Sequence, residues 1–309
     1  MRPRRERARS MNPDVAWPIW SRERAQRVAS ALESALPKIG ESPQPLHAAM
    51  RYAVLGGGKR VRALLAYASG ELAGADVGVV DHAAVAVELV HAYSLIHDDL
   101  PCMDDDVLRR GKPTCHVAHG EAMALLAGDA LQTLAFEVLA GAPVRHAQTQ
   151  APAQIATLAT AAGSRGMAGG QALDLSHVGA ALSLDELERM HSLKTGALIQ
   201  AAVRLGAGCG RPLGQAESDA LDRYAAAVGL GFQVVDDVLD VEGTAQSLGK
   251  TAGKDAMQGK PTYVSLLGLD AAKERVAELR DQAHTALLGF GAGARRLNEL
   301  ADWIAFRKN

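Results

Sequence analysis

Ten stretches of this sequence repeat apolar residues with the period of an α-helix, and none alternates apolar and polar residues long enough to predict a sheet strand. Clusters of Gly, Pro and Asp, which end helices, separate the stretches. Alanine, the strongest helix former, supplies 58 of the 309 residues, whereas aromatic residues make up only 4%. The predicted helices are Arg22–Leu36, Pro45–Leu55, Val61–Leu72, Val79–His97, His119–Ala140, Ala151–Gly170, Leu184–Leu205, Gln215–Val241, Pro261–Leu269 and Ala271–Leu288. We therefore predict an all-α fold.

The first twenty residues differ in composition from the rest. Residues 1–10 hold five arginines, and residues 11–20 contain two prolines, an asparagine and an aspartate. This segment lacks the apolar core of a secretory signal and most of the serines of an organelle-targeting peptide. We predict a flexible N-terminal arm over residues 1–20. A single all-helical domain is predicted over residues 21–309, because no low-complexity linker interrupts them.

Composition excludes several classes of partner. Lys and Arg together number 33 and Asp and Glu 35, and the net charge of −2 excludes nucleic-acid binding through bulk charge. The most apolar segment, Ala122–Ala142, is interrupted by Asp129 and Glu137, so we predict no membrane span.

The three cysteines are odd in number and scattered, which argues against a disulfide framework and favours a reducing compartment. We therefore expect a cytoplasmic protein.

Two clusters of aspartates interrupt otherwise apolar helices. The first lies within residues 97–106 and the second within residues 233–240. Asp236 and Asp240 are four residues apart, which puts them on one helix face ~6 Å apart along the axis. Carboxylates this close inside a bundle repel each other unless a cation lies between them. One cluster alone could be a solvated acidic helix end, but two clusters among apolar residues predict a hard cation such as Mg²⁺ with oxygen ligands.

The first cluster cannot continue as a regular helix. Asp98 and Asp104 are six residues apart, which is out of phase for one helix face, and Pro101 lies between them. A helix that ends or bulges at this point can turn Asp104 back toward Asp98. We therefore predict a turn that gathers these two carboxylates.

Basic residues accompany both clusters. Arg109 and Arg110 directly follow the first cluster, and several lysines lie near or after the second. A turn of three glycines at residues 56–58 leads into basic residues and a predicted helix, whose N-terminus can receive phosphate oxygens. Cations beside metal-binding carboxylates suit a ligand that is itself highly anionic, such as a diphosphate. The glycine turn matches neither a Walker A loop nor a dinucleotide fingerprint, so we exclude P-loop and Rossmann functions.

Across residues 50 to 265 the chain resembles the trans-isoprenyl diphosphate synthase family, and within it the bacterial enzymes that make a fifteen-carbon product. Six motifs in the family's order carry the resemblance: Gly57–Arg62, His91–Thr114, Gly169–Asp174, Lys194–Gly196, Gln233–Asp240 and Gly249–Tyr263. The resemblance implies a large bundle of helices around a deep central cavity, with the two aspartate clusters facing each other across its mouth. It also implies a homodimer and three Mg²⁺ ions, for which Mn²⁺ can substitute. The metal ligands it implies are Asp98, Asp99, Asp104, Asp236 and Asp240.

The resemblance also implies binding and catalytic roles. The allylic diphosphate would bind Arg109, Lys194, Lys250 and Lys260, and isopentenyl diphosphate would bind Lys59, Arg62, His91 and Arg110. Loss of diphosphate would leave an allylic carbocation, stabilised by oxygens of Thr195 and Gln233 and by the carbonyl of Lys194. Catalytic roles are thus expected for Lys194, Thr195, Gln233, Asp98, Asp104 and Asp236. Gln171 and Asp174 would support Lys194 or a metal-bound water, or make an ordinary polar contact between helices.

Tyr93 is expected to set the product length. It lies five residues before Asp98, between one and two helical turns deeper, next to the small Ser94, so its ring would block the cavity floor. In the family, an aromatic residue here combined with a two-residue insertion, found here within Leu100–Met103, marks the fifteen-carbon synthases. We expect Mg²⁺-dependent head-to-tail condensation of dimethylallyl or geranyl diphosphate with isopentenyl diphosphate, giving farnesyl diphosphate and diphosphate.

Three other functions stay open at this point. One is a geranylgeranyl or geranyl diphosphate synthase of the same family, which would differ in product length. Another is a class I terpene cyclase, which would carry an Asn/Ser/Glu-type second metal motif and would need no second diphosphate site. The last is a non-catalytic subunit of a heteromeric prenyl synthase, which would be expected to lose an aspartate cluster. The presence of both aspartate clusters and of Lys59 and Arg62 favours the synthase.

Overall fold

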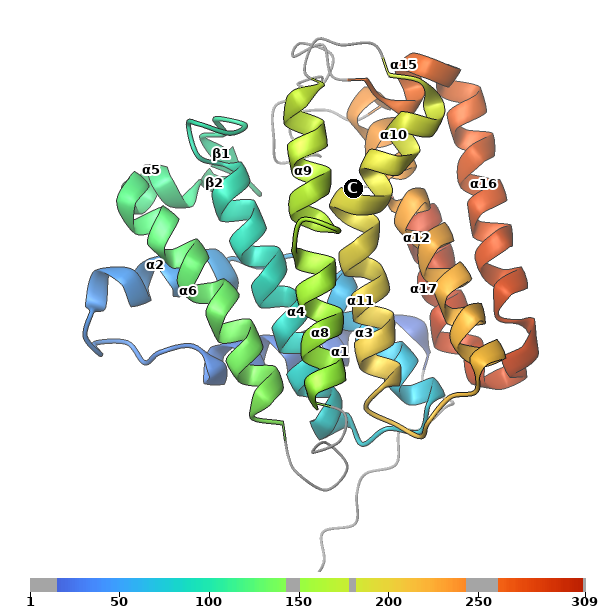
Figure 1. The fold of residues 1–309 in the computed structure, drawn as a ribbon, viewed down its shortest axis with the longest axis horizontal. Helices are drawn as coiled ribbons and strands as arrows, with labels where there is room; N and C mark the ends of the chain where they lie inside the picture. Colours follow the sequence, from blue (N-terminus) through green and yellow to red (C-terminus); the bar gives the residue numbers. More distant parts are fainter. Residues whose placement is uncertain (1–15, 143–150, 178–181, 243–260, 308–309) are drawn as a thin grey trace, which may run out of the picture.

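The fold is all-α, which confirms the prediction, and its long helices pack side by side (Figure 1). The computed structural model describes residues 16–142, 151–177, 182–242 and 261–307. The α-helices in these ranges are α1 (Trp17–Ala35), α2 (Gln44–Leu55), α3 (Val61–Leu72), α4 (Val77–Asp98), α5 (Cys115–His119), α6 (Glu121–Ala140), α8 (Ala151–Ala162), α9 (Met167–Ser176), α10 (Leu184–His191), α11 (Ala197–Ala207), α12 (Gln215–Glu242), α15 (Tyr263–Leu267), α16 (Leu269–Ala286) and α17 (Arg295–Ala305). Two segments with other helical geometries are the π-helical turn η1 (Ser192–Gly196) and the 3₁₀ segment η2 (Leu288–Ala294).

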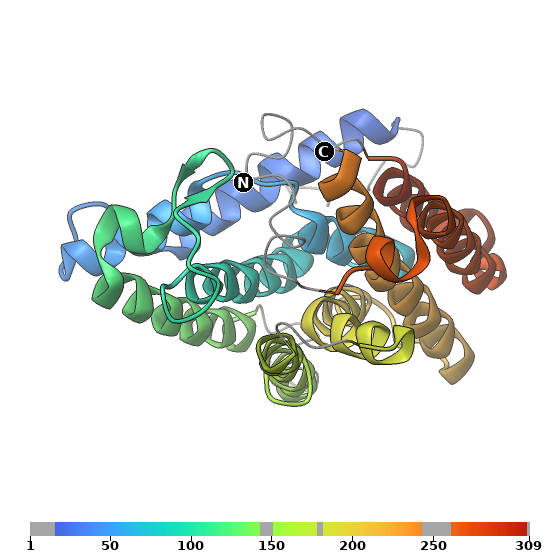
Figure 2. The same ribbon diagram turned by 90° about the horizontal axis from the view of Figure 1, so that it is seen from above.

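Helices α4 and α12, which carry the two aspartate clusters, are the central elements of the packing. Helix α4 contacts α3, α6 and α11, and α12 contacts α11, α16 and α17. Helix α11 therefore lies between them and links the two halves of the molecule. Seen from above, α8 and α9 appear nearly end-on and cover the same side as α6 and α11 (Figure 2).

Small residues let helices α3 and α11 pack with their backbones in contact. A Cβ atom placed on Gly206 of α11 would lie 2.1 Å from the carbonyl oxygen of Ala66 on α3. A Cβ on Gly70 of α3 would lie 3.2 Å from the carbonyl oxygen of Gly206. Apart from Glu71 and Leu72, the residues of α3 are buried, and several are alanines. The alanine-rich composition thus serves close helix packing as well as helix propensity.

Two of the predicted long helices are interrupted. Ala151–Gly170 was expected to be one helix, but α8 ends at Ala162 and α9 begins at Met167, so this prediction is wrong. The break follows from Gly163 and Gly166, because Gly166 has φ −139° and ψ −128°, a conformation that a helix cannot include. The predicted helix Leu184–Leu205 exists but contains the π-helical turn η1 at its middle.

A short hairpin and a C-terminal helix were not predicted. Strand β1 (Leu108–Arg109) pairs antiparallel with β2 (Lys112–Pro113). Arg110 and Gly111 connect them with φ values of 54° and 73°, and such positive values suit a two-residue hairpin turn. Helix α17 buries apolar residues against α12 and α16. It was not predicted, because its sequence contains many polar residues.

Residues 17–20 are helical, although they were predicted to belong to a flexible arm. Residues 1–15 lie outside the described residues, but α1 already begins at Trp17, inside the segment predicted to be flexible. Trp20 is only 2% exposed, and its indole nitrogen donates to Glu71 at 2.9 Å. Trp17 stacks on Trp20 with ring centroids 5.5 Å apart. These aromatic contacts, which sequence composition does not reveal, fix the chain before residue 20.

By length and composition alone, α4 and α6 could each cross a membrane. In α4, 67% of the most apolar 18-residue stretch is buried inside the protein. In α6, only 33% of the corresponding stretch is buried. A buried core helix in a soluble protein passes the same test, so the absence of a membrane span stays a prediction. Helix α6 instead exposes several apolar residues on the surface.

Candidate active site

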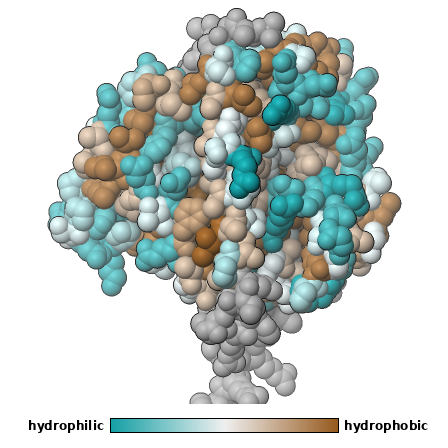
Figure 3. Space-filling model, in the orientation of Figure 1, coloured by the Kyte–Doolittle hydropathy of each residue, from teal (hydrophilic) through white to brown (hydrophobic). Residues whose placement is uncertain are grey.

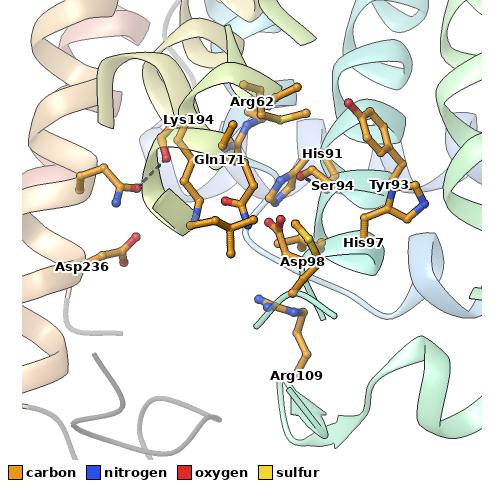
Figure 4. Close-up of a pocket in the computed structure, with 18 of the residues that line it drawn as sticks. Arg62, His91, Tyr93, Ser94, His97, Asp98, Arg109, Gln171, Lys194 and Asp236 are labelled. Atoms are coloured by element: carbon orange, nitrogen blue, oxygen red, sulfur yellow. Dashed lines mark hydrogen bonds between the residues drawn. The ribbon is translucent and has the colours of Figure 1, made fainter. Parts of the chain in front are cut away.

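A cavity of about 530 Å³ lies among α4, α9, η1 and α12. This volume falls in the range typical of pockets for small organic ligands. Acidic, basic and apolar residues line it together: Asp98 comes from the end of α4, Lys194 from η1 and Asp236 from α12. Figure 4 shows Asp98, Lys194, Asp236 and Arg109 converging on the same space. The deep central cavity expected from the resemblance is therefore present.

The first aspartate cluster turns as the sequence predicts. Helix α4 ends at Asp98, and the backbone N–H of Asp104 donates to the carbonyl oxygen of Asp98 at 2.8 Å. Burial raises the pKa of Asp98 to about 6, while Lys194 acts to lower it and Asp104 to raise it. A buried carboxylate with another carboxylate beside it is stabilised by added positive charge.

Asp99 makes a different contact from Asp98. Asp99 is 3% exposed. The Nε and Nη2 atoms of Arg109 both donate to its Oδ1, at 2.8 Å and 2.6 Å. Arg109 also lies 3.7 Å from Asp106, and it lines the cavity. Asp99 thus holds Arg109, a predicted diphosphate ligand, at the cavity wall, and Asp99 itself is not among the described residues that line the cavity.

The second cluster faces the cavity through Asp236. The guanidinium of Arg307 donates to Asp236 at 2.7 Å and to the carbonyl oxygen of Phe232 at 2.9 Å, and lies 4.0 Å from the centre of the Phe232 ring. Asp237, the next residue, accepts from the backbone N–H of Tyr263 at 2.7 Å and so anchors α15. Asp240 is 7% exposed. Asp236 is therefore the member of this cluster that can reach a ligand in the cavity.

The described residues contain no group of three or more His, Cys, Asp or Glu side chains already arranged around one point. The carboxylates at the cavity nonetheless have the right chemistry for Mg²⁺, because they offer only oxygen donors and leave room for water and phosphate oxygens. Asp98 and Asp236 lie on different sides of the cavity (Figure 4). A highly charged ligand between them would let several ions bridge the two clusters.

The π-helical turn η1 presents Lys194 and Thr195 to the cavity. Such turns occur often at functional sites, where they shift side chains out of the regular helical register. The Nζ of Lys194 lies 2.5 Å from Oδ2 of Asp174 on α9. A Cβ on Gly170 would lie 2.1 Å from the backbone nitrogen of Lys194, so only glycine lets α9 approach so closely. The close packing of α9 at Gly170 therefore helps to hold Lys194 in position.

Gln171 and Thr195 are buried polar groups on this wall. Gln171 is 8% exposed and lines the cavity, and its amide has no hydrogen-bond partner within the part of the chain that the structure describes. Thr195 donates to Oε1 of Gln233 at 2.9 Å. The Nε2 of Gln233 lies 3.3 Å from Nδ1 of His191, a residue that sequence reasoning did not single out. The only sequence signal for His191 was its place one turn before Lys194 on a helix face.

A further basic group lines the same cavity. Arg62 is buried, His91 is half-buried, and both line the cavity. Desolvation together with the charges of Arg62 and Arg110 holds the pKa of His91 well below its usual range. Arg110 lines the cavity too, and it donates to the carbonyl oxygen of Gly57 in the glycine-rich turn. Burial and the charge of Arg307 lower the pKa of Lys59.

Glu88 of α4, which sequence reasoning also missed, holds the start of α3 next to this group. It is 3% exposed, and it accepts from Arg60 at 3.1 Å and from the backbone N–H of Ala63 at 3.2 Å. Arg60 has a left-handed φ of 54°, which turns the chain into α3. A Glu inside an apolar stretch was the available signal, because a buried carboxylate needs a partner.

Tyr93 and Ser94 lie on α4 at the edge of the cavity. Tyr93 is 7% exposed, and its ring meets that of His97 edge to face at 5.8 Å. Ser94 donates to the carbonyl oxygen of His91 at 2.9 Å. Both residues are among those that line the cavity. The predicted ligands Lys250 and Lys260 lie outside the described residues.

Comparison with known proteins finds the same family throughout. The model of the family described as polyprenyl synthetase matches residues 43–286. The chain is 50% identical over 267 residues to farnesyl diphosphate synthase of Escherichia coli, covering 85% of this chain and 89% of that protein. It is 46% identical over 293 residues to the chloroplastic geranylgeranyl pyrophosphate synthase of Capsicum annuum, covering 94% and 79%.

A solved structure with the same fold contains a metal and a ligand. The geranyltransferase of Helicobacter pylori, complexed with magnesium and isoprenyl diphosphate, superposes with a TM-score of 0.82 at 31% identity. The match covers 94% of this chain and 98% of that one.

Proposed function

This chain belongs to the polyprenyl synthetase family, and from this we propose that it condenses geranyl or dimethylallyl diphosphate with isopentenyl diphosphate to form farnesyl diphosphate. One observation carries the proposal. A single cavity is lined by aspartates from two helices, by Lys194 and Arg109, and by a further basic group of Arg62, His91 and Arg110, so it can hold two diphosphates at once. A cyclase would need no second diphosphate site, and a non-catalytic subunit would need neither aspartate cluster.

The aspartates are proposed to hold Mg²⁺. Asp98, Asp104 and Asp236 would be the main ligands of three ions, with Mn²⁺ able to substitute, and Asp240 would lie close by. Asp99 would act by holding Arg109 in place, as its two-pronged contact supports. The ions would neutralise the departing diphosphate. Asp174 would keep Lys194 at the cavity, and Arg109 and Lys194, with Lys250 and Lys260, would bind the allylic diphosphate.

The basic group of Lys59, Arg62, His91 and Arg110 is proposed to bind isopentenyl diphosphate. Lys59, Arg62 and Arg110 supply positive charge, and Glu88 keeps the start of α3 fixed against α4. His91 is held neutral by its burial among these arginines, so it would bind as a hydrogen-bond partner rather than as a cation.

The reaction proceeds by ionisation, condensation and elimination. The allylic C–O bond breaks, and its electron pair leaves with the diphosphate. The isopentenyl double bond then attacks the allylic carbocation to form the new C–C bond. A proton finally leaves the condensed cation for the released diphosphate, which restores a double bond. Oxygens of Thr195 and Gln233 and the Lys194 carbonyl stabilise the cation, and the apolar parts of the cavity exclude water.

The purified protein is expected to release diphosphate from geranyl and isopentenyl diphosphates in the presence of Mg²⁺, with a fifteen-carbon product. Chelation with EDTA should abolish turnover, because the carboxylates alone cannot neutralise the leaving group, and Mg²⁺ should restore it. Coupled diphosphate release and mass spectrometry measure both. Turnover that persists after the metal has been removed would contradict the proposal. Pepper geranylgeranyl synthase is also similar to this chain, so a twenty-carbon product is the second candidate outcome.

We place the protein in the cytoplasm and propose that it forms a homodimer through α5 and α6. Helix α6 is apolar along its length but only a third buried, and Leu125 and Leu126 are each 47% exposed. Val117 of α5 adds a further exposed apolar side chain at 51%. At the left of the molecule, where α5 and α6 lie, apolar residues are mixed with polar ones on the surface (Figure 3). Exposed apolar patches of this kind mark protein interfaces.

Replacing Leu125 and Leu126 together with Glu is expected to convert the dimer to a monomer, because two charges would be buried at the interface. Light scattering coupled to size-exclusion chromatography measures the mass. Leu288→Glu serves as the control, since this residue is 75% exposed on a different part of the surface and its change should leave the mass unaltered. A wild-type monomer, or a double variant that stays dimeric, would refute this interface.

A further inference from the structure

Three side chains from three different elements form a hydrogen-bonded row that leads from the cavity into the core. Thr195 of η1 donates to Oε1 of Gln233 on α12 at 2.9 Å. The other end of the same amide, Nε2, lies 3.3 Å from Nδ1 of His191 on α10. Thr195 and Gln233 line the cavity, whereas His191 is 8% exposed and stands behind them.

The orientation of the Gln233 amide decides what the cavity offers to a cation. An amide NH₂ group can only donate, so in this arrangement Nδ1 of His191 accepts. The amide oxygen then faces Thr195 and retains a second lone pair. A reversed amide would place N–H groups, with their partial positive charge, at the same wall. Oxygen stabilises a developing carbocation there, whereas N–H groups repel it.

The surroundings of His191 keep its ring fixed and uncharged. The ring stacks on Tyr263 with centroids 5.6 Å apart and planes at 20°. The backbone N–H of Tyr263 donates to Asp237 of α12 at 2.7 Å, which ties this platform to the helix that carries Gln233. Burial lowers the pKa of His191 to about 4, with Asp174 acting to raise it and Lys194 to lower it. An uncharged ring can offer a bare nitrogen at Nδ1.

We propose that His191 is a positioning residue, which accepts a hydrogen bond from Gln233 and thereby holds the amide oxygen toward Thr195 and the reacting cation. It touches neither substrate nor metal, and it acts only through Gln233. This inference rests on the proposed function, because it assigns a role in stabilising the carbocation of that reaction.

The kinetic test is a double-mutant cycle. His191→Leu is expected to lower kcat about 10- to 100-fold while KM for both diphosphates changes less than about twofold, because binding is left intact and only the cation loses support. His191→Asn should recover most of kcat, since its side-chain oxygen can accept the same hydrogen bond. In a Gln233→Leu background, His191→Leu should cause no further loss. Tyr263→Phe keeps the stacked ring and should leave kcat unchanged.

A second measurement does not depend on activity. Long-range ¹H–¹⁵N spectra of histidine-labelled protein should show His191 uncharged near neutral pH, with its proton on Nε2 and a bare Nδ1. A proton on Nδ1 would overturn the inference, as would additive losses in the cycle or no rescue by Asn. If the wild-type protein makes no prenyl product, the proposed function fails, and the spectrum alone then decides whether His191 accepts from Gln233. Circular dichroism of each variant verifies that the fold is retained.

Discussion

Asp98→Asn and Asp236→Asn are each expected to lower kcat by about 10³-fold, because each removes one negative charge from a cluster proposed to hold the ions that neutralise the leaving diphosphate. Asparagine has nearly the same shape as aspartate, so the fold should survive. Steady-state diphosphate release measures kcat, and calorimetric titration of Mg²⁺ in the presence of a non-hydrolysable allylic analogue measures binding. Both variants should bind Mg²⁺ more weakly.

A matched control separates loss of the site from a general effect of removing charge. Asp270 is exposed in the first turn of α16, away from the cavity, and Asp270→Asn should leave kcat within about twofold, as is usual for surface changes. If Asp98→Asn and Asp236→Asn behave like this control, the aspartate clusters are not the metal site.

Tyr93→Ala is expected to shift the main product from fifteen to twenty or more carbons. The ring is 7% exposed and stands at the edge of the cavity, so its removal would open space for a longer chain. Chromatography and mass spectrometry of the dephosphorylated products measure chain length. Tyr93→Phe keeps the ring and should keep the fifteen-carbon product.

The two Tyr93 variants also distinguish a steric role from a chemical one. If Tyr93→Phe lengthens the product as much as Tyr93→Ala, the hydroxyl rather than the ring volume sets the limit. If neither variant changes the product, another residue forms the floor of the cavity. Both outcomes would contradict the floor hypothesis for this residue.

Most of the features that the sequence predicted correctly depend on neighbours along the chain. The period of apolar residues and the abundance of alanine predicted the all-α fold, and Pro101 predicted the turn from Asp98 to Asp104. The break between α8 and α9 was missed, although the polar and glycine residues 163–166 interrupt the apolar pattern and end the helix there. The hairpin at residues 108–113 is too short to produce an alternating pattern.

The missed contacts that hold the site residues in position depend on residues distant in sequence. Glu88 and Arg60 are 28 residues apart, and His191 and Gln233 are 42 apart, so no local pattern connects either pair. Such pairs become visible only when helices are placed side by side. The motifs therefore predicted many of the residues that line the cavity, but they did not predict the residues that hold them in position.

The contact of Gly70 and Gly206 joins helix α3, which follows the proposed isopentenyl diphosphate site, to helix α11, which follows the proposed allylic site. Helix α3 begins beside Lys59 and carries Arg62, and α11 continues directly from the turn that carries Lys194 and Thr195. Because these helices touch backbone to backbone, no side-chain rotation can alter their separation. Under the proposed function, a fixed contact between main chains would thus link the two helices that follow the two substrate sites.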